Sequence, residues 1–539
     1  MRGRRGAHCG VKACVQSENS ADNLQRLFQQ LFVSGQPARY DSMFSTFVPP
    51  PIPASQQIAP IVTDTYRLQK SARPQEAIPA ASTTSAGQVP LPAPPKRLVS
   101  LDAYRGFIMT MLAASGFGIF RLAQLKPDNS VWQIWDYETF QRLKPHFTHP
   151  PWESITGWCG VSFWDLIQPS FMFMVGVAMP FSYARRGAMG SSNMRRLFHA
   201  VFRAIVLTLM GVFLASQNSV TTNWVFTNVL AQIGLGYVFA YLLLGRSMSV
   251  QLVALVMILV SYWGFFVWTP PPADYDYAAV DASHEDGEIY DGDFAPWSKN
   301  ANAGHFFDEW FLNLLRAPAA SSDTGADDSD EAGNDVTPDI AAAERSLLSQ
   351  WLFSNPERYT HSRGGYVTLN FIPSIATTLL GILCGQLLLG GDSAGRKLGT
   401  LILAGAICFS LGILAHHSVC PIVKRIWTPS WVLFSGGYVM WMLAAFYLVF
   451  DVLPLRLLAF PLVVVGMNSI VMYMLGQLLR PWVSQHVVQT HFAGLLSAFY
   501  GDGCLQPDGI GAVLVPSATF VVFWLIAFWM YRNRYFVRV

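Results

Sequence analysis

The chain has 539 residues, of which 52% are hydrophobic and 13% are charged, and its formal net charge is +2. A soluble domain carries about 25% charged residues, so this composition excludes an ordinary soluble domain and indicates a protein that crosses a membrane several times. The small net charge and the lack of a basic run argue against a nucleic-acid partner. The seven cysteines show no spacing typical of a zinc site, so we expect no metal.

Residues 1–96 are rich in Pro, Ala, Ser and Gln and contain no apolar run long enough to span a bilayer. The segments "VPPPIPASQQIAP" and "VPLPAPPK" are typical of a disordered, partly polyproline tail. The alternative is a start codon placed upstream of the true one. In either case we expect no site residue in this segment.

After residue 97 the sequence contains about ten apolar runs of the roughly 20 residues that a transmembrane helix needs. The first five runs lie within 97–269 and the last five within 367–539, so we predict a membrane core in two parts around an insert at 270–366. The runs are 104–124, 163–184, 197–216, 224–245, 249–269, 368–391, 396–416, 429–450, 458–480 and 512–531.

Alternate loops between these runs are short, basic and almost free of acidic residues, which places them in the cytoplasm by the positive-inside rule. Both termini are then cytoplasmic. The basic residues are Lys96, Arg97, Arg185, Arg186, Arg195, Arg196, Arg246, Arg396, Lys397, Arg456, Arg532, Arg534 and Arg538. The opposite side receives the insert, whose acidic stretch "SSDTGADDSDEAGNDVTPD" predicts partial disorder.

We therefore predict an all-α polytopic membrane protein with a disordered cytoplasmic N-terminal tail and an extracytoplasmic insert. Three cysteines, Cys159, Cys420 and Cys504, fall on the outer side, where a disulfide between two of them is compatible with an oxidising compartment. The sequence does not say which two would pair.

Ionisable residues at or inside spans are costly and therefore mark candidate sites. In "RLVSLDAYRGF", Asp102 and Arg105 are one helical turn apart and are expected to interact. This pair is either a local ion pair at a helix start or an anion site on the cytoplasmic side.

A second candidate precedes the run at 163–184. Ser162 and Asp165 form an S-x-x-D pattern typical of a helix N-terminus. His149 stands before two prolines, and Trp152 suits a membrane interface. A capped helix preceded by a solvated histidine explains these residues as well as a catalytic pair does.

Polar residues also enter later runs. Asn228 and Gln232 are four residues apart on one helix face, and Asn468 lies within the run at 458–480. Lys424 and Trp427 stand at an outer boundary. Hydrogen bonds between helices are the alternative explanation for the amides.

Five segments occur in an order that resembles the heparan-α-glucosaminide N-acetyltransferase family and its bacterial relatives. They are "RLVSLDAYRGF", "FWDLIQPSFMFMVGVAMPFS", "FIPSIATTLLGILCG", "VKRIWTPSWVLFSGG" and "VVGMNSIVMY". The family comprises transmembrane acyltransferases that take acetyl from cytoplasmic acetyl-CoA and deliver it to a terminal glucosamine across the membrane. The resemblance runs from about residue 97 to the C-terminus and is interrupted by the insert.

The resemblance implies that His149 is the essential histidine of an H-x-x-W-x-G segment and that Asp165 opens the following span. Two departures concern this segment: the expected glycine is Ser154, and the spacing to Asp165 is longer, as if "SITGWC" were inserted. An alignment without that gap puts Trp158 and Gly160 on the motif and Ile155 in the place of the histidine. His146 is a second candidate.

A third departure is Gln232, which replaces an arginine of the family in "NVLAQI". The motifs SLDxxRG, WTPS and GxNS match Asp102 with Arg105, Trp427–Ser430 and Gly466–Ser469.

The expected mechanism is acetyl transfer in which His149 deprotonates the acceptor, Asp165 orients it, and Asn228 or Asn468 stabilises the oxyanion. An acetyl-histidine intermediate is a competing route. Residues expected at the acetyl-CoA site are Asp102, Arg105, Arg185, Arg196 and Arg396. Residues expected on the acceptor side are Trp152, Lys424 and Trp427.

The expected partners are the bilayer, acetyl-CoA and a sugar or glycan acceptor, and the resemblance also suggests a homodimer. The expected location is the inner membrane of a bacterium. Two alternatives stay open: an O-acetyltransferase acting on an envelope polysaccharide, and a transporter of a small solute.

Overall fold

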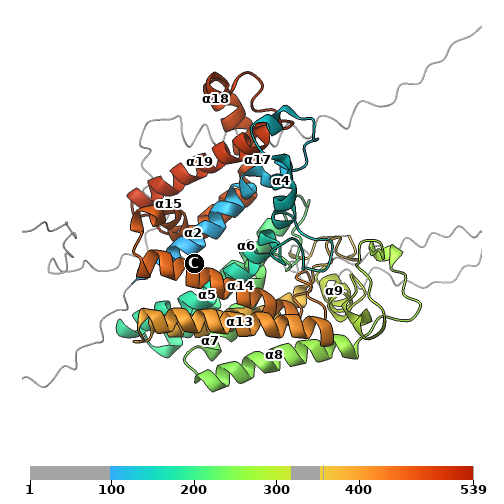
Figure 1. Ribbon diagram of the computed structural model, residues 1–539. Coiled ribbons are helices and arrows are strands. Elements are labelled where there is room, and N and C mark those ends of the chain that lie inside the picture. The colour runs from blue at the N-terminus through green and yellow to red at the C-terminus, as the bar shows by residue number, and fades with distance from the viewer. Residues whose placement is uncertain (1–96, 317–351, 356, 538–539) are drawn as a thin grey trace, which may run out of the picture. The chain divides into compact units, whose positions relative to one another are not determined.

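A computed structural model describes residues 97–316, 352–355 and 357–537, and all its regular elements are helices (Figure 1). The tail at 1–96 and most of the acidic stretch of the insert lie outside the described residues. Seven described helices are long and apolar enough to cross a membrane. They are α5 (Phe163–Ala188), α6 (Asn193–Ala215), α8 (Met248–Trp268), α12 (Phe371–Leu389), α13 (Ala394–Ser418), α14 (Pro429–Tyr447) and α19 (Gly511–Arg532).

Two further apolar segments are pairs of helices with a sharp bend between them, each of which is a broken span or a re-entrant loop. Helix α2 (Val99–Ala113) bends by 50° into η1 (Ser115–Gly118) and α3 (Ile119–Leu122), and α15 (Arg456–Met467) bends by 70° into α16 (Ser469–Leu478). The first break contains Gly116 and Gly118 at positive φ, a conformation that glycine adopts readily.

The predicted run at 224–245 forms only α7 (Val229–Leu243), because Asn228 caps the helix and the chain before it is extended. The described residues therefore contain seven candidate spans, or nine if each bent pair is one span, rather than ten uniform helices.

The remaining helices are shorter. They are η2 (Ser130–Gln133), α4 (Tyr137–Leu143), η3 (Lys144–Phe147), η4 (Ala278–Val280), η5 (Gly292–Trp297), α9 (Ala303–Leu314), η6 (Thr368–Asn370), the π-helical η7 (Leu448–Val452), α17 (Arg480–Trp482), the π-helical η8 (Val483–Phe492) and α18 (Ala493–Tyr500). Two of them, η6 and η7, extend the candidate spans of α12 and α14.

Helix α5 lies in the centre of the bundle and packs against α12 through small residues. A Cβ atom on Gly381 would lie 2.1 Å from the carbonyl oxygen of Phe173, so only glycine permits this backbone approach. Helices α2 and α15 are equally close, since a Cβ on Gly106 would lie 1.8 Å from the Leu462 oxygen. Such contacts are typical of helices that associate inside membranes.

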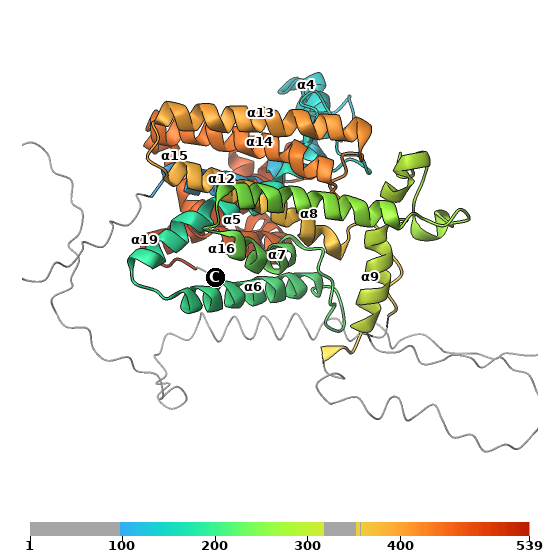
Figure 2. The same ribbon diagram turned by 90° about the horizontal axis from the view of Figure 1, so that it is seen from below.

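The described part of the insert is folded, whereas the acidic stretch for which partial disorder is predicted lies outside the described residues. Figure 2 shows α9 near one end of α8, running across the direction of α8. Trp297 stacks on Phe266 at 4.9 Å and is fully buried. Lys299 and Glu288 form a buried ion pair at 2.8 Å. The insert therefore has its own core against the ends of the spans.

The disulfide considered for the outer side does not form among the described cysteines, because Cys159, Cys420 and Cys504 are all free thiols.

The two ends of the bundle are named by their residues on α5. The histidine end is the end where α5 begins at Phe163, and the basic end is the end where α5 finishes, near Arg185 and Arg186.

Candidate functional site

Three side chains that are far apart in the sequence meet at the histidine end. The Nδ1 atom of His149 lies 2.5 Å from Oδ1 of Asp165, and the Nζ atom of Lys424 donates to the same oxygen at 3.0 Å. Lys424 Nζ also lies 3.4 Å from His149 Nδ1. Asp165 therefore accepts from both side chains at one oxygen atom.

The N-terminal cap of α5 holds in place the loop that carries His149, termed the histidine loop. The Ser162 hydroxyl accepts from the Trp164 amide and donates to the carbonyl of Thr148 at 2.6 Å. Ser162 thus caps the helix as its sequence pattern predicts, and its hydroxyl also ties the helix start to the residue before His149. Asp165 is consequently free to turn to His149 and Lys424 instead of capping.

Backbone pairing between two loops brings Lys424 to this position. Ser154 donates its amide to the Ile422 carbonyl at 2.8 Å, and its hydroxyl accepts from the Lys424 amide at 3.0 Å. Arg425 donates to the Pro150 carbonyl at 3.0 Å. Ser154, which replaces the glycine that the resemblance predicts, therefore links the two loops.

Asp165 and Lys424 are 2% and 4% exposed, respectively. Burial lowers the pKa of Lys424, but the attraction of Asp165 outweighs burial, and the net pKa is raised. The lysine is therefore charged at neutral pH. Removing one partner of such a pair leaves a buried charge without compensation.

His149 is partly open to solvent, with 39% of its side chain exposed. Burial lowers its pKa, Lys424 and Arg425 lower it further by repulsion, and Asp165 opposes them without reversing the shift. The imidazole is therefore neutral at pH 7. When Nδ1 donates to Asp165, the lone pair is on Nε2, which is the arrangement of a histidine that acts as a general base.

The second candidate histidine has a different environment. His146 is buried, its Nδ1 lies 2.9 Å from the Val161 carbonyl, and the exposed Trp158 covers it edge-on. No contact joins it to Asp165 in the described residues. The histidine that meets the carboxylate is thus His149.

The two tryptophans expected on the acceptor side are both buried. Trp152 is 1% exposed and donates to the Trp297 carbonyl at 3.0 Å. Trp427 is fully buried and donates to the Thr377 hydroxyl at 3.3 Å. Trp152 joins the insert to the histidine loop, while Trp427 joins the Lys424 loop to α12.

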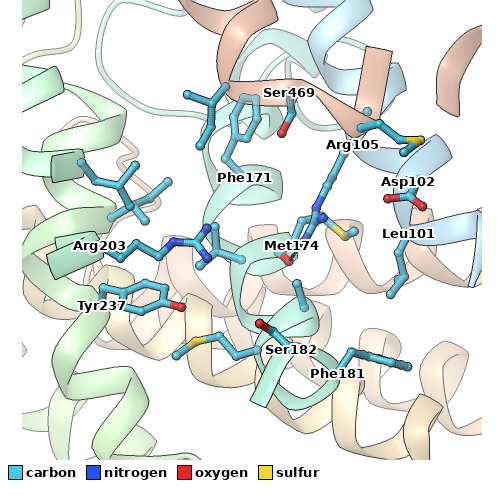
Figure 3. Close-up of a pocket in the computed structure, with 18 of the residues that line it drawn as sticks. Leu101, Asp102, Arg105, Phe171, Met174, Phe181, Ser182, Arg203, Tyr237 and Ser469 are labelled. Atoms are coloured by element: carbon cyan, nitrogen blue, oxygen red, sulfur yellow. Dashed lines mark hydrogen bonds between the residues drawn. The ribbon is translucent and has the colours of Figure 1, made fainter. Parts of the chain in front are cut away.

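The basic end contains a cavity of about 470 Å³, termed the first cavity, between α2, α5, α6, α7 and α16. Figure 3 shows Arg105 and Arg203 extending into it from opposite sides. Arg105 donates to the Met174 carbonyl at 3.2 Å, and the Arg203 guanidinium lies 4.9 Å from the centre of the Tyr237 ring. The Nε atom of Arg203 is buried and has no partner in the described part of the chain.

Only some of the residues expected at the acetyl-CoA site line the first cavity. Arg105 and Arg185 line the first cavity, whereas Arg196 donates to Asn193 and Arg396 pairs with Asp392, both outside its lining. Asp102 also lines it, but it pairs with Arg97 at 2.6 Å and not with Arg105. Arginines that line it without having been predicted are Arg97, Arg186 and Arg203.

The two asparagines expected at the reacting centre are not beside His149. Asn228 caps α7 by accepting from the Leu230 amide at 2.9 Å. Asn468 lies at the break between α15 and α16, where its amide donates to the Tyr535 carbonyl and accepts from the Val537 amide. Both asparagines make structural contacts, and no hydrogen bond joins either of them to His149 in the described ranges. Their oxyanion role stays a prediction.

Gln232 behaves as a packing residue. Its amide donates to the backbone carbonyls of Val367 and Thr368 at 3.2 and 3.4 Å. It thereby joins α7 to the start of η6, which is the interhelical hydrogen bonding that the sequence left open.

Helix α5 connects the two ends. Asp165 and Arg185 are 20 residues apart on it, which corresponds to about 30 Å along a helix axis. The first cavity contacts α5 from Arg186 to Phe171, and Phe171 is about 9 Å from Asp165 by the same rise per residue. The cavity thus follows most of the length of the span that carries Asp165.

No group of three or more His, Cys, Asp or Glu side chains that could hold a metal ion occurs in the described ranges. No protein-family model matches this chain, and no curated protein resembles it significantly.

Proposed function

We propose that the chain is a transmembrane acyltransferase that moves an acetyl group from acetyl-CoA at the basic end to an amino sugar or related glycan at the histidine end. The observation that carries this proposal is that one helix holds Asp165 of the histidine cluster and, about 30 Å farther along, Arg185 of the first cavity. That separation equals the thickness of a bilayer core. The five ordered sequence motifs support the same reaction class.

The first cavity suits the donor. Guanidinium groups bind phosphate oxygens through paired N–H bonds, and Arg105, Arg185 and Arg203 line this cavity. Its apolar lining, which includes Met174 and Phe171, extends toward the centre of the bundle. The phosphates of CoA would bind at the arginines, and the acyl arm would extend along α5 toward Asp165.

The histidine end suits the acceptor. The Nε2 atom of His149 takes a proton from the amine or hydroxyl of the sugar, and the resulting nucleophile forms a bond to the thioester carbonyl carbon. The C–S bond then breaks, and the departing thiolate takes the proton back from the imidazolium. Asp165 holds the imidazole and stabilises its charged form.

Lys424 gives Asp165 a second partner in this scheme. Its ammonium neutralises the carboxylate in the resting protein, which keeps Asp165 from raising the basicity of His149 too far. The resting imidazole stays neutral and ready to accept a proton.

The direct test is acetyl transfer from labelled acetyl-CoA to glucosamine, measured on the full chain in membranes. General base catalysis contributes about 10²–10⁴-fold, so His149→Gln is expected to reduce transfer by that factor. His146→Gln is the matched control and is expected to retain most of the activity. Full activity of His149→Gln would contradict the proposal.

Two additional assays identify the acceptor group and the route of transfer. Replacing glucosamine by a sugar without an amine distinguishes N-acetylation from O-acetylation. Incubation with acetyl-CoA alone distinguishes direct transfer from an acetyl-histidine route. Label that is bound covalently to the chain, and that is absent from His149→Gln, would establish the covalent intermediate.

A further inference from the structure

A second cavity, of about 740 Å³, lies at the basic end between the first residues of α2, the first turn of α15 and the chain after α19. Its charged lining consists of Arg97, Arg456, Arg532, Arg534 and Asp102. Figure 1 shows α2, α15 and α19 side by side in this part of the bundle, and contacts between these helices agree with the view. The acetyl-transfer scheme makes no use of this cavity.

The charges around the second cavity do not balance. Four guanidinium groups face one carboxylate, and Asp102 is already paired with Arg97. The other nearby carboxylate, Asp451, accepts from the Val99 and Ser100 amides at the start of α2. No ion pair in the described ranges neutralises Arg456, Arg532 or Arg534. Cations that share a cavity in this way favour a bound anion.

The chain after α19 is held in the shape that builds this cavity. Asn468 is 1% exposed, and its side chain donates to the Tyr535 carbonyl at 3.1 Å and accepts from the Val537 amide at 3.0 Å. Arg534 has a positive φ of 59°, which is uncommon for a residue with a side chain. The buried amide thus fixes the turn that places Arg534 on the cavity, where Arg532 at the end of α19 and Arg456 from α15 also lie.

A general tendency toward basic residues at one side of a membrane does not account for this arrangement. Arg396 is also at a basic helix end, yet it pairs locally with Asp392 and lines neither cavity. The arginines of the second cavity come from three separate segments and meet at one place.

We propose that the second cavity is a binding site for a phosphate group, separate from the first cavity. Arginine recognises phosphate oxygens by paired, charge-assisted hydrogen bonds. Two sources share this chemistry. Leu457 and Leu458, next to Arg456, are 86% and 63% exposed, which suits an anionic lipid whose headgroup reaches the arginines. Arg97, Asp102 and Met467 line both cavities, which suits a soluble nucleotide phosphate beside the first cavity.

The experiment uses the full chain in lipid nanodiscs and two probes. Binding of adenosine 3′,5′-bisphosphate is measured by calorimetry in phosphatidylcholine discs. Enrichment of phosphatidylglycerol around the protein is measured by mass spectrometry in mixed discs. The test variant is Arg456→Gln with Arg534→Gln, and the control is Arg396→Gln.

Loss of two charge-assisted contacts is expected to weaken one of the probes about tenfold or more in the double variant. A loss confined to the bisphosphate identifies a soluble phosphate, and a loss confined to phosphatidylglycerol identifies a lipid headgroup. Asn468→Ala is expected to weaken the same probe, because it releases the turn that carries Arg534.

Unchanged binding of both probes in the double variant would overturn the proposal, as would an equal loss in Arg396→Gln. The three replaced arginines are all exposed, so thermal unfolding is expected to be unchanged for the arginine variants. Neither readout requires turnover, so failure of acetyl transfer leaves this test intact.

Discussion

The two ends of the bundle differ in how their charged side chains are paired and buried. At the histidine end, Asp165 and Lys424 are buried and paired, and only His149 is partly open. At the basic end, Arg203 projects into the first cavity without a carboxylate partner among the described residues. A closed, neutralised cluster is suited to holding one proton acceptor in position, whereas unpaired guanidinium groups are suited to an anion that arrives from outside.

The largest expected effect tests whether the histidine end is a closed ion cluster. Lys424→Met leaves the Asp165 carboxylate buried without its cation and is expected to cost about 3–5 kcal/mol of unfolding free energy. Denaturant unfolding in detergent measures it. The double variant Lys424→Met with Asp165→Asn removes both charges and is expected to recover much of the loss. A single-variant cost near zero would show that the pair is not a closed cluster.

At the basic end the same kind of substitution is expected to affect binding and not folding. Arg203→Gln removes an unpaired guanidinium from the first cavity and is expected to weaken acetyl-CoA binding about 10- to 100-fold, since hydrogen bonds to charged groups contribute about 1.5–3 kcal/mol. Calorimetric titration measures the affinity, and Arg396→Gln is the control. If Arg203→Gln instead unfolds the protein at unchanged affinity, the contrast between the ends is wrong.

The smallest effect concerns the insert that covers the histidine end. Burial raises the pKa of Asp308 to about 7 from its ordinary 3.8, so this group makes stability fall as pH rises between those values. Burial lowers the pKa of His305 to about 4 from 6.5, so this group makes stability rise over its own interval. The two effects oppose each other between about pH 4 and pH 6.5.

In Asp308→Asn, only the effect of His305 on the pH dependence of stability is therefore expected to remain. Its thermal stability should rise from about pH 4 to pH 6.5 more steeply than that of the unmodified chain, in which the two slopes largely cancel. Melting temperatures at matched pH values measure the difference. An identical pH profile for both proteins would mean that Asp308 is ionised throughout and that the insert contains no such balance.

Much of the fold is visible in the sequence because long apolar runs have few alternatives in a membrane. The runs near 163–184 and 512–531 each form one continuous helix, α5 and α19. The broken helix at α15 and α16 was not foreseen, since a bend of 70° depends on how Asn468 binds the chain after α19. The backbone contacts of Asn468 were not predictable for the same reason, because a sequence pattern does not show whether an amide in an apolar run binds a substrate or the backbone.

The candidate site was predictable in part. His149 and Asp165 could be paired because a helix cap and a resemblance both pointed to that segment. The contact of Lys424 with Asp165 joins positions 259 residues apart and depends on the pairing of two irregular loops, which no periodicity encodes. Arg203 was overlooked, although a charge inside the apolar run at 197–216 is itself a signal.

The sidedness of the reaction tests the central claim most directly. The full chain is reconstituted into sealed vesicles, acetyl-CoA is supplied on one side only, and the acceptor on the other side only. The proposed arrangement predicts acetylated acceptor in one of the two configurations, with loss of product in His149→Gln. Product that forms only when donor and acceptor share one compartment would contradict a path that connects the two ends of α5.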